Sequence, residues 1–136
     1  MGDIVDQRTK MQIIKVPQLA WYDPGNLELS LPDSWKVEMF LIAGHDRTKL
    51  APSAIETAIA KPLGTPPLHE LAKGKKEAVI VFDDTSRVTR VAQIVPFVLN
   101  ELAEAGVADK NIRFICGLGL HAAISRPDFI KKLGED

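Results

Sequence analysis

The sequence predicts an α/β fold: a Rossmann-like parallel or mixed sheet flanked by helices, in a single domain. The first observation is a continuous apolar, β-rich run at residues 79–82, which is typical of a strand covered on both faces. The second is a helical stripe of apolar residues at 91–102. A second apolar strand follows within residues 111–119, and another helical pattern within 125–134. This order predicts a βαβ unit with two parallel strands and a right-handed crossover.

Proline, glycine and serine residues mark where the helices of this unit begin and end. Pro96 lies inside the 91–102 stripe and removes an interior hydrogen bond, so we expect a kink or a late helix start there. Gly106 is a natural stop for this helix. Ser125 is placed to act as the N-cap of the last helix, with Pro127 in its first turn and Gly134 as its stop.

The first half of the chain is less regular. Residues 1–26 hold several proline and glycine turn formers, and we expect them to be loosely ordered ahead of a folded domain at 27–136. The expected elements are strands at 27–32 and 35–44, a helix that begins near Pro52 or Ser53 and ends before Pro62, and a helix within 65–74 that Gly74 closes.

Length and composition describe a soluble globular protein. The chain has 136 residues, enough for one core, and 46% of them are hydrophobic and 26% charged. The net charge of −1 offers no bulk attraction to nucleic acid or to an anionic membrane, and no apolar run approaches the ~20 residues that a membrane span needs. The single cysteine and the acidic, polar amino terminus, which is unlike a signal peptide, predict a cytoplasmic protein.

Polar residues follow both predicted parallel strands at the point where each strand ends. Because ligands bind beyond the carboxyl ends of strands in open α/β sheets, these residues are expected to converge at one edge. They are Asp83, Asp84, Ser86, Arg87 and His121. Adjacent carboxylates repel each other, so the two aspartates require a nearby compensating group such as Arg87, a metal or a ligand.

Each of these residues also has a structural interpretation. Either aspartate can serve as a helix N-cap or a turn residue, and Arg87 can simply neutralise the pair. A histidine after a glycine-rich turn is more often a structural hydrogen-bonder than a catalyst, and the glycines themselves need only a tight turn. Thr85 and Thr89 can act as caps. We expect His45 and His69 to be solvated and Cys116 to be inert core.

Two motifs stand at the ends of the predicted parallel strands: D-D-x-[ST]-R-x-T at residues 83–89 and G-x-H at residues 119–121. They resemble motifs of the amino-terminal domain of the lactate racemase family, the nickel-pincer-nucleotide-dependent 2-hydroxy-acid racemases and epimerases. The family's usual forms read close to DDxTRPTP and GTHRxMT. This chain differs from them at Val88, Arg90, Leu120, Ala122, Ile124 and Ser125. The resemblance runs from about Leu27 to the end of the chain.

The resemblance implies roles for the matching residues. His121 matches a histidine that exchanges a proton while hydride passes to the cofactor, Arg87 matches the anchor of the substrate carboxylate, and Asp84 matches an orienting aspartate. Asp83, Ser86 and Thr89 are expected to support them. In the family, the second catalytic histidine, the lysine that carries the cofactor and the nickel-ligating histidine belong to a carboxy-terminal domain. We therefore expect this chain alone to be inactive and to bind neither nickel nor the cofactor; its three histidines are also dispersed in the sequence.

Two other interpretations stay open. The strand-end aspartates superficially resemble those of Mg²⁺-dependent phosphoryl-transfer proteins of the haloacid-dehalogenase or receiver type, although the dehalogenase motif needs D-x-D-x-T spacing. Alternatively, the chain is a non-catalytic α/β interaction domain that docks through Trp21, Tyr22 and Trp35.

Overall fold

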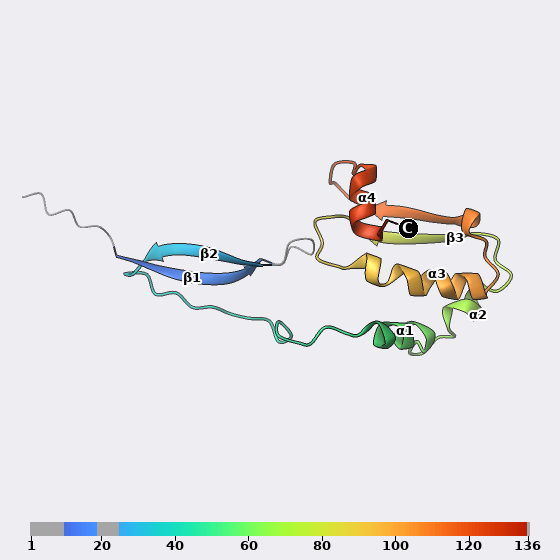
Figure 1. The fold of residues 1–136 in the computed structure, drawn as a ribbon, viewed down its shortest axis with the longest axis horizontal. Coiled ribbons are helices and arrows are strands. Elements are labelled where there is room, and N and C mark those ends of the chain that lie inside the picture. Colours follow the sequence, from blue (N-terminus) through green and yellow to red (C-terminus); the bar gives the residue numbers. More distant parts are fainter. Residues whose placement is uncertain (1–9, 19–24, 136) are drawn as a thin grey trace, which may run out of the picture. The chain divides into compact units, whose positions relative to one another are not determined.

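The computed structural model describes residues 10–18 and 25–135 (Figure 1). The chain divides into two compact units, Met1–Arg47 and Thr48–Asp136, and each is described by itself. Trp21 and Tyr22, two of the predicted docking residues, lie outside the described residues, whereas Trp35 is exposed.

The first unit contains an antiparallel pair of strands, β1 (Met11–Gln18) and β2 (Gly25–Pro32). Their register places Ile14 opposite Leu29, and it also places Lys15 opposite Glu28, whose charged groups form an ion pair of 2.9 Å. The strand predicted at 27–32 is thus present. β1 lies inside the segment expected to be loosely ordered, and its β-branched residues favour the extended conformation that the partner strand stabilises.

The predicted strand at residues 35–44 is wrong. Residues 36–42 form no regular element, and a turn follows at 43–46. Phe40 in this segment is 87% exposed. The residue types suit a strand, but a strand needs hydrogen bonds from a neighbouring strand, and no described residue pairs with this segment.

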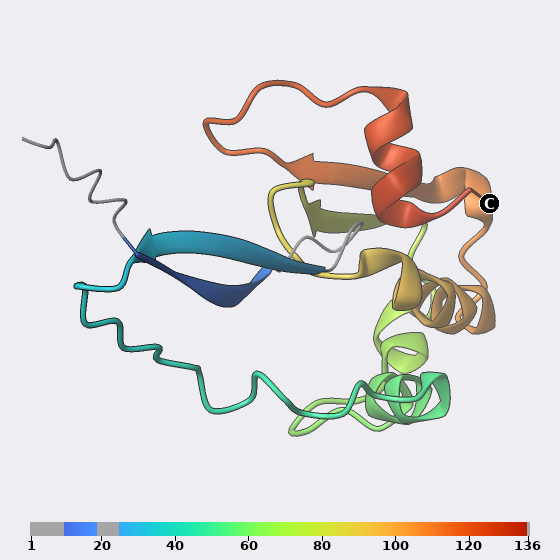
Figure 2. The same cartoon turned by 60° about the vertical axis from the view of Figure 1, so that its left-hand side comes forward.

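The second unit contains the predicted parallel pair, β3 (Ala78–Asp83) and β4 (Ile112–Gly117). The register runs from Ala78 opposite Ile112 to Asp83 opposite Gly117, so both strands end at the same edge. The chain between them forms a helix, which confirms the βαβ connection (Figures 1 and 2). The α/β class is therefore confirmed.

The helices begin and end close to the predicted signals. They are α1 (Pro52–Ala60), α2 (Leu68–Ala72), α3 (Val95–Glu104) and α4 (Arg126–Leu133), with short 3₁₀ turns η1 (Val91–Gln93) and η2 (Asp109–Asn111). Pro96 lies in the first turn of α3, so the late start is confirmed and the proline removes no interior bond. At α4, the Asp128 carboxylate accepts hydrogen bonds from the backbone N–H and the hydroxyl of Ser125 at 2.9 and 2.7 Å.

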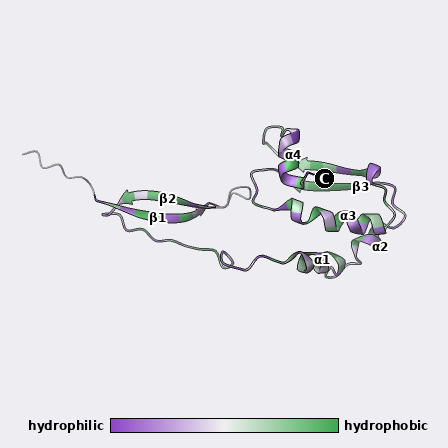
Figure 3. Ribbon diagram, viewed as in Figure 1, coloured by the Kyte–Doolittle hydropathy of each residue, from purple (hydrophilic) through white to green (hydrophobic). Residues whose placement is uncertain are grey.

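The sheet of the second unit is covered on one face only. Ile80 packs with α3 in the core, and the Phe82 ring meets Phe129 of α4 edge to face, with centroids 5.4 Å apart. Because Ile80 and Phe82 share one face of β3, both helices cover that face, while α1 and α2 contact α3. Figure 2 shows the helices beside β3 and β4, and Figure 3 shows that these two strands are largely apolar.

The prediction that residues 79–82 are covered on both faces is therefore wrong. Val81 is 69% exposed, and Val79 and Ile115 are also exposed on the same face. None of the four helices of the described chain is left to cover them. The main buried cluster consists of Ala72, Leu102 and Val107 with their neighbours on α3 and the strands, and Phe82 and Val95 are also buried. None of the helices within residues 10–18 and 25–135 combines the length and the apolar character that a membrane span requires.

Candidate active site

Asp84 forms the turn that follows β3. Its Oδ1 accepts hydrogen bonds from the backbone N–H and the hydroxyl of Ser86, at 2.8 and 2.5 Å, and its own carbonyl accepts from the Arg87 N–H at 3.3 Å. These bonds define an Asx-type turn, so the turn interpretation of this aspartate is confirmed. The N-cap interpretation is wrong for both aspartates, because the next helical turn, η1, begins after Arg90.

His121 reaches Asp84 from a tight turn after β4. The His121 N–H donates to the Leu118 carbonyl at 3.0 Å, and Gly119 lies in the left-handed region at φ 58°, which favours glycine. The His121 Nδ1 makes a short contact with the Asp84 Oδ2. The two residues are 37 positions apart, and the parallel register brings them together as predicted.

The Asp84 carboxyl is held in its ionised form. Its pKa lies well below the ordinary 3.8, because it accepts a hydrogen bond first from the Ser86 side chain and then from His121. An ionised carboxylate only accepts, so the Nδ1 of His121 carries the hydrogen and donates it. The Asp84 side chain is 6% exposed and that of His121 54%, so the pair joins a buried carboxylate to an accessible imidazole.

A cavity of about 320 Å³ opens beside this pair. It is lined by Asp83, Asp84, Arg87 and the turn residues 117–121. Arg87 is exposed, and no ion pair joins it to either aspartate within the described residues. The interpretation that Arg87 neutralises the aspartates is therefore wrong, and Arg87 lines the cavity instead.

Lys132 of α4 takes the place that Arg87 was expected to fill. Its Nζ lies 2.9 Å from the Asp83 Oδ1 as an ion pair, without the geometry of a hydrogen bond. The same ammonium donates to the carbonyls of Arg87 and Thr89, each at 2.9 Å. Sequence reasoning missed this residue. A signal existed, because Lys132 follows Phe129 by three positions and therefore lies on the face of α4 that meets the sheet.

The other candidate residues either support the site or have only a structural role. Ser86 belongs to the turn through Asp84, and Thr89 contributes a backbone carbonyl to Lys132. His45 lies exposed in the turn at 43–46, as expected. Burial, and then the charges of the nearby aspartates, raise the pKa of Cys116, so the thiol stays protonated.

His69 is not simply solvated, contrary to expectation. Its Nδ1 lies 2.7 Å from the Glu101 Oε2, and its backbone N–H donates to the same oxygen at 3.0 Å, so Glu101 of α3 closes the start of α2. Glu104 adds a second carboxylate, and one ligand atom from each of the three lies within 4.8 Å of the others. The spacing of the histidines in the sequence did not predict this group, because its two carboxylates come from α3 and its histidine from α2.

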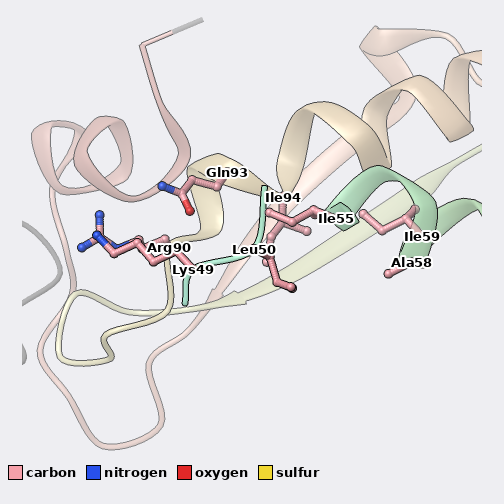
Figure 4. A pocket seen from close by; sticks show the side chains of 8 residues that line it. All are labelled: Lys49, Leu50, Ile55, Ala58, Ile59, Arg90, Gln93 and Ile94. Atoms are coloured by element: carbon pink, nitrogen blue, oxygen red, sulfur yellow. The ribbon is translucent and has the colours of Figure 1, made fainter. Parts of the chain in front are cut away.

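A separate pocket of about 430 Å³ lies between α1 and residues 90–94 (Figure 4). Isoleucine and leucine side chains gather toward one end, and Lys49 and Arg90 lie at the other with Gln93 beside them. None of its eight described lining residues carries a carboxylate, an imidazole or a hydroxyl. The pocket therefore offers no carboxylate–imidazole pair, unlike the cavity at the strand ends.

Fold and site together define an α/β domain with a candidate ligand site at the carboxyl ends of its parallel strands, where a carboxylate–imidazole pair lies beside an open cavity that an arginine also lines. Comparison with known proteins narrows this class. Residues 22–136 match the family described as the lactate racemase N-terminal domain, and the chain belongs to that family.

Two curated relatives are named lactate racemase. The protein of Lactiplantibacillus plantarum is 32% identical over 82 residues, which cover 60% of this chain and 19% of the relative. The protein of Thermoanaerobacterium thermosaccharolyticum is 28% identical over 129 residues, which cover 93% of this chain and 29% of the relative. The chain thus spans less than a third of the length of either relative.

A solved structure gives the same result. The lactate racemase apoprotein from T. thermosaccharolyticum superimposes with a TM-score of 0.60 at 28% identity, covering 92% of this chain and 28% of that one. The predicted family is therefore confirmed.

Proposed function

We propose that this chain is the part of a 2-hydroxy-acid racemase or epimerase that binds the substrate carboxylate and moves one proton. The observation that carries the proposal is the contact between Asp84 and the His121 Nδ1, at the wall of a cavity that Arg87 also lines. The family's two strand-end motifs thus meet at a single site.

His121 is the proton-transfer residue in this proposal. Because Asp84 accepts the hydrogen of Nδ1, the Nε2 of the neutral ring has a free lone pair and can take a proton from a substrate hydroxyl. The imidazolium that forms is stabilised by the adjacent carboxylate. When the reaction reverses, the same nitrogen returns the proton, because an imidazole can act both as a general base and as a general acid.

Arg87 is the carboxylate anchor. A guanidinium presents paired N–H donors that match a carboxylate in two parallel hydrogen bonds. Arg87 suits this role because neither aspartate ties up its side chain, and it lines the cavity with His121. A 2-hydroxy acid carries its hydroxyl one carbon from the carboxylate, so one small cavity suffices for both contacts.

The donor set of this cavity fits the substrate better than it fits a metal. The carboxylate of Asp83 is already paired with Lys132. That of Asp84 already accepts hydrogen bonds from Ser86 and His121. The same engagement argues against Mg²⁺ and phosphoryl transfer, because Mg²⁺ needs carboxylate oxygens free to bind it. We therefore infer that residues other than those of this cavity hold the nickel-pincer nucleotide, which would accept and return hydride when bound.

The test is steady-state kinetics with 2-hydroxy acids on the complete, cofactor-loaded protein that contains this chain. His121→Gln is expected to lose on the order of 10²–10⁴-fold in turnover with its cofactor content unchanged. Arg87→Lys keeps the charge and loses the paired donors, so KM is expected to rise more than kcat falls. His45→Gln is the matched control, because His45 is an exposed histidine that does not line the cavity. Wild-type turnover in His121→Gln would refute the proposal.

A further inference from the structure

We propose that Lys132 is a positioning residue of this site: its ammonium fixes the loop at residues 83–89 so that Arg87 faces the cavity. The inference rests on the proposed function, because it assumes that Arg87 binds the substrate carboxylate. Neither of the two strand-end motifs contains Lys132, which lies on α4, 45 positions after Arg87.

Three contacts join Lys132 to that loop. The Nζ donates to the carbonyls of Arg87 and Thr89, and it forms the ion pair with Asp83 at the end of β3. All three oxygens lie 2.9 Å from the ammonium: the two carbonyls accept hydrogen bonds, and the Asp83 carboxylate supplies the opposite charge. The side chain is 0% exposed, so little water competes for these contacts.

The carbonyl that Lys132 holds belongs to Arg87 itself. A fixed peptide group sets the direction in which the Arg87 side chain leaves the backbone, and therefore where its guanidinium lies in the cavity. The hydrogen bonds of Ser86 and of the Arg87 N–H to Asp84 are local and shape the turn. Lys132 ties this turn to a separate helix.

The helix that carries Lys132 is itself anchored. Phe129 packs on Phe82 of β3, and Asp128 caps the start of α4 through Ser125. The ammonium therefore reaches the loop from a support that the sheet holds. A shift of about 1 Å in a binding group costs on the order of 10²-fold in rate, so this support is expected to matter for substrate binding.

The test compares Lys132→Met with Lys131→Met in the complete, cofactor-loaded enzyme. Lys131 is the neighbouring cation on the same helix and is exposed, so its replacement should leave KM and kcat unchanged. Lys132→Met is expected to raise KM for the 2-hydroxy acid on the order of 10- to 100-fold, with a smaller change in kcat per loaded site. A purely structural role predicts less folded enzyme with an unchanged KM, and that result would overturn the proposal.

A second variant covers the case in which Lys132→Met does not fold. Asp83→Asn with Lys132→Met removes both charges together, so no buried charge is left without its partner. This double variant is expected to fold and still show a raised KM; a KM equal to that of Asp83→Asn alone would overturn the proposal. Arg87→Ala distinguishes the role of Arg87 from that of Lys132. An unchanged KM there refutes the role of Arg87, whereas a raised KM in Arg87→Ala beside an unchanged KM in Lys132→Met refutes only that of Lys132.

Discussion

Replacing Lys132 with methionine should lower the free energy of unfolding of this chain by about 3 kcal/mol. Removing one partner of a buried ion pair typically costs about 3–5 kcal/mol, and the two hydrogen bonds from the ammonium to backbone carbonyls are of the charge-assisted kind. The Asp83 side chain is 31% exposed, so water stabilises the carboxylate left behind and places the cost at the lower end of that range. The total free energy of unfolding of a domain of ordinary size is only about 5–15 kcal/mol, so this loss is a large part of it.

Urea unfolding followed by far-UV circular dichroism measures this change. With a slope of about 2 kcal/mol per molar, the midpoint should fall by roughly 1.5 M, while Lys131→Met stays at the wild-type midpoint. A loss under about 1 kcal/mol would contradict the stabilising role of the ion pair, because it would mean that the ammonium stabilises the fold little more than a methionine of similar volume.

The ion pair between Lys132 and Asp83 should make the stability of the wild-type chain depend on pH in the acid range. Burial pushes the pKa of Asp83 upward, but its contacts with Thr89 and Lys132 outweigh burial and leave the pKa below 3.8. A lowered pKa contributes stability above the unfolded value and loses it as the pH falls. Part of the advantage of wild type over Lys132→Met should therefore disappear below pH 3.8. An advantage that stays constant into strong acid would contradict the ion pair.

Two further predictions concern the histidines. Asp84→Asn places an amide N–H₂ against the His121 Nδ1, so the ring hydrogen should move to Nε2; ¹⁵N NMR of the imidazole reads the tautomer, and an unchanged tautomer would show that Asp84 does not orient the ring. The Glu101 hydrogen bond raises the pKa of His69 above 6.5, and the same bond lowers that of Glu101 below 4.5. The stability that His69 contributes is lost as the pH rises through its raised pKa. The stability that Glu101 contributes is lost as the pH falls through its lowered pKa. Urea midpoints of wild type and His69→Gln should therefore differ most between pH 4.5 and 6.5, and a difference independent of pH would argue against the pair.

Local signals in the sequence were reliable guides to this fold. Pro96 indicated the late start of α3, and Ser125 with Gly134 marked the ends of α4, because capping and proline chemistry act within a few residues. The convergence of Asp84 and His121 was also predictable, since parallel strands must end at the same edge.

Features that depend on distant partners were harder to predict. The residue types at 35–44 favour a strand, but strand formation is decided by pairing, which the local sequence does not reveal. The apolar run at 79–82 suggested cover on two faces, whereas both helices that meet the sheet pack on the same face. At the site, charge alone favoured Arg87 as the partner of the aspartates. The actual partner, Lys132, depends on how α4 packs against β3.

The parallel register has a kinetic consequence. The turn around Asp84 can form from its own neighbours, because Ser86 is two residues away, but the bond to His121 closes a separation of 37 residues. Such long-range closures come slowly compared with turns and helices. A refolding chain should therefore complete its carboxylate turn early and gain the imidazole only when β4 docks beside β3. The NMR signals of the His121 ring would then change when β4 pairs with β3, so the candidate active site reports when the sheet forms.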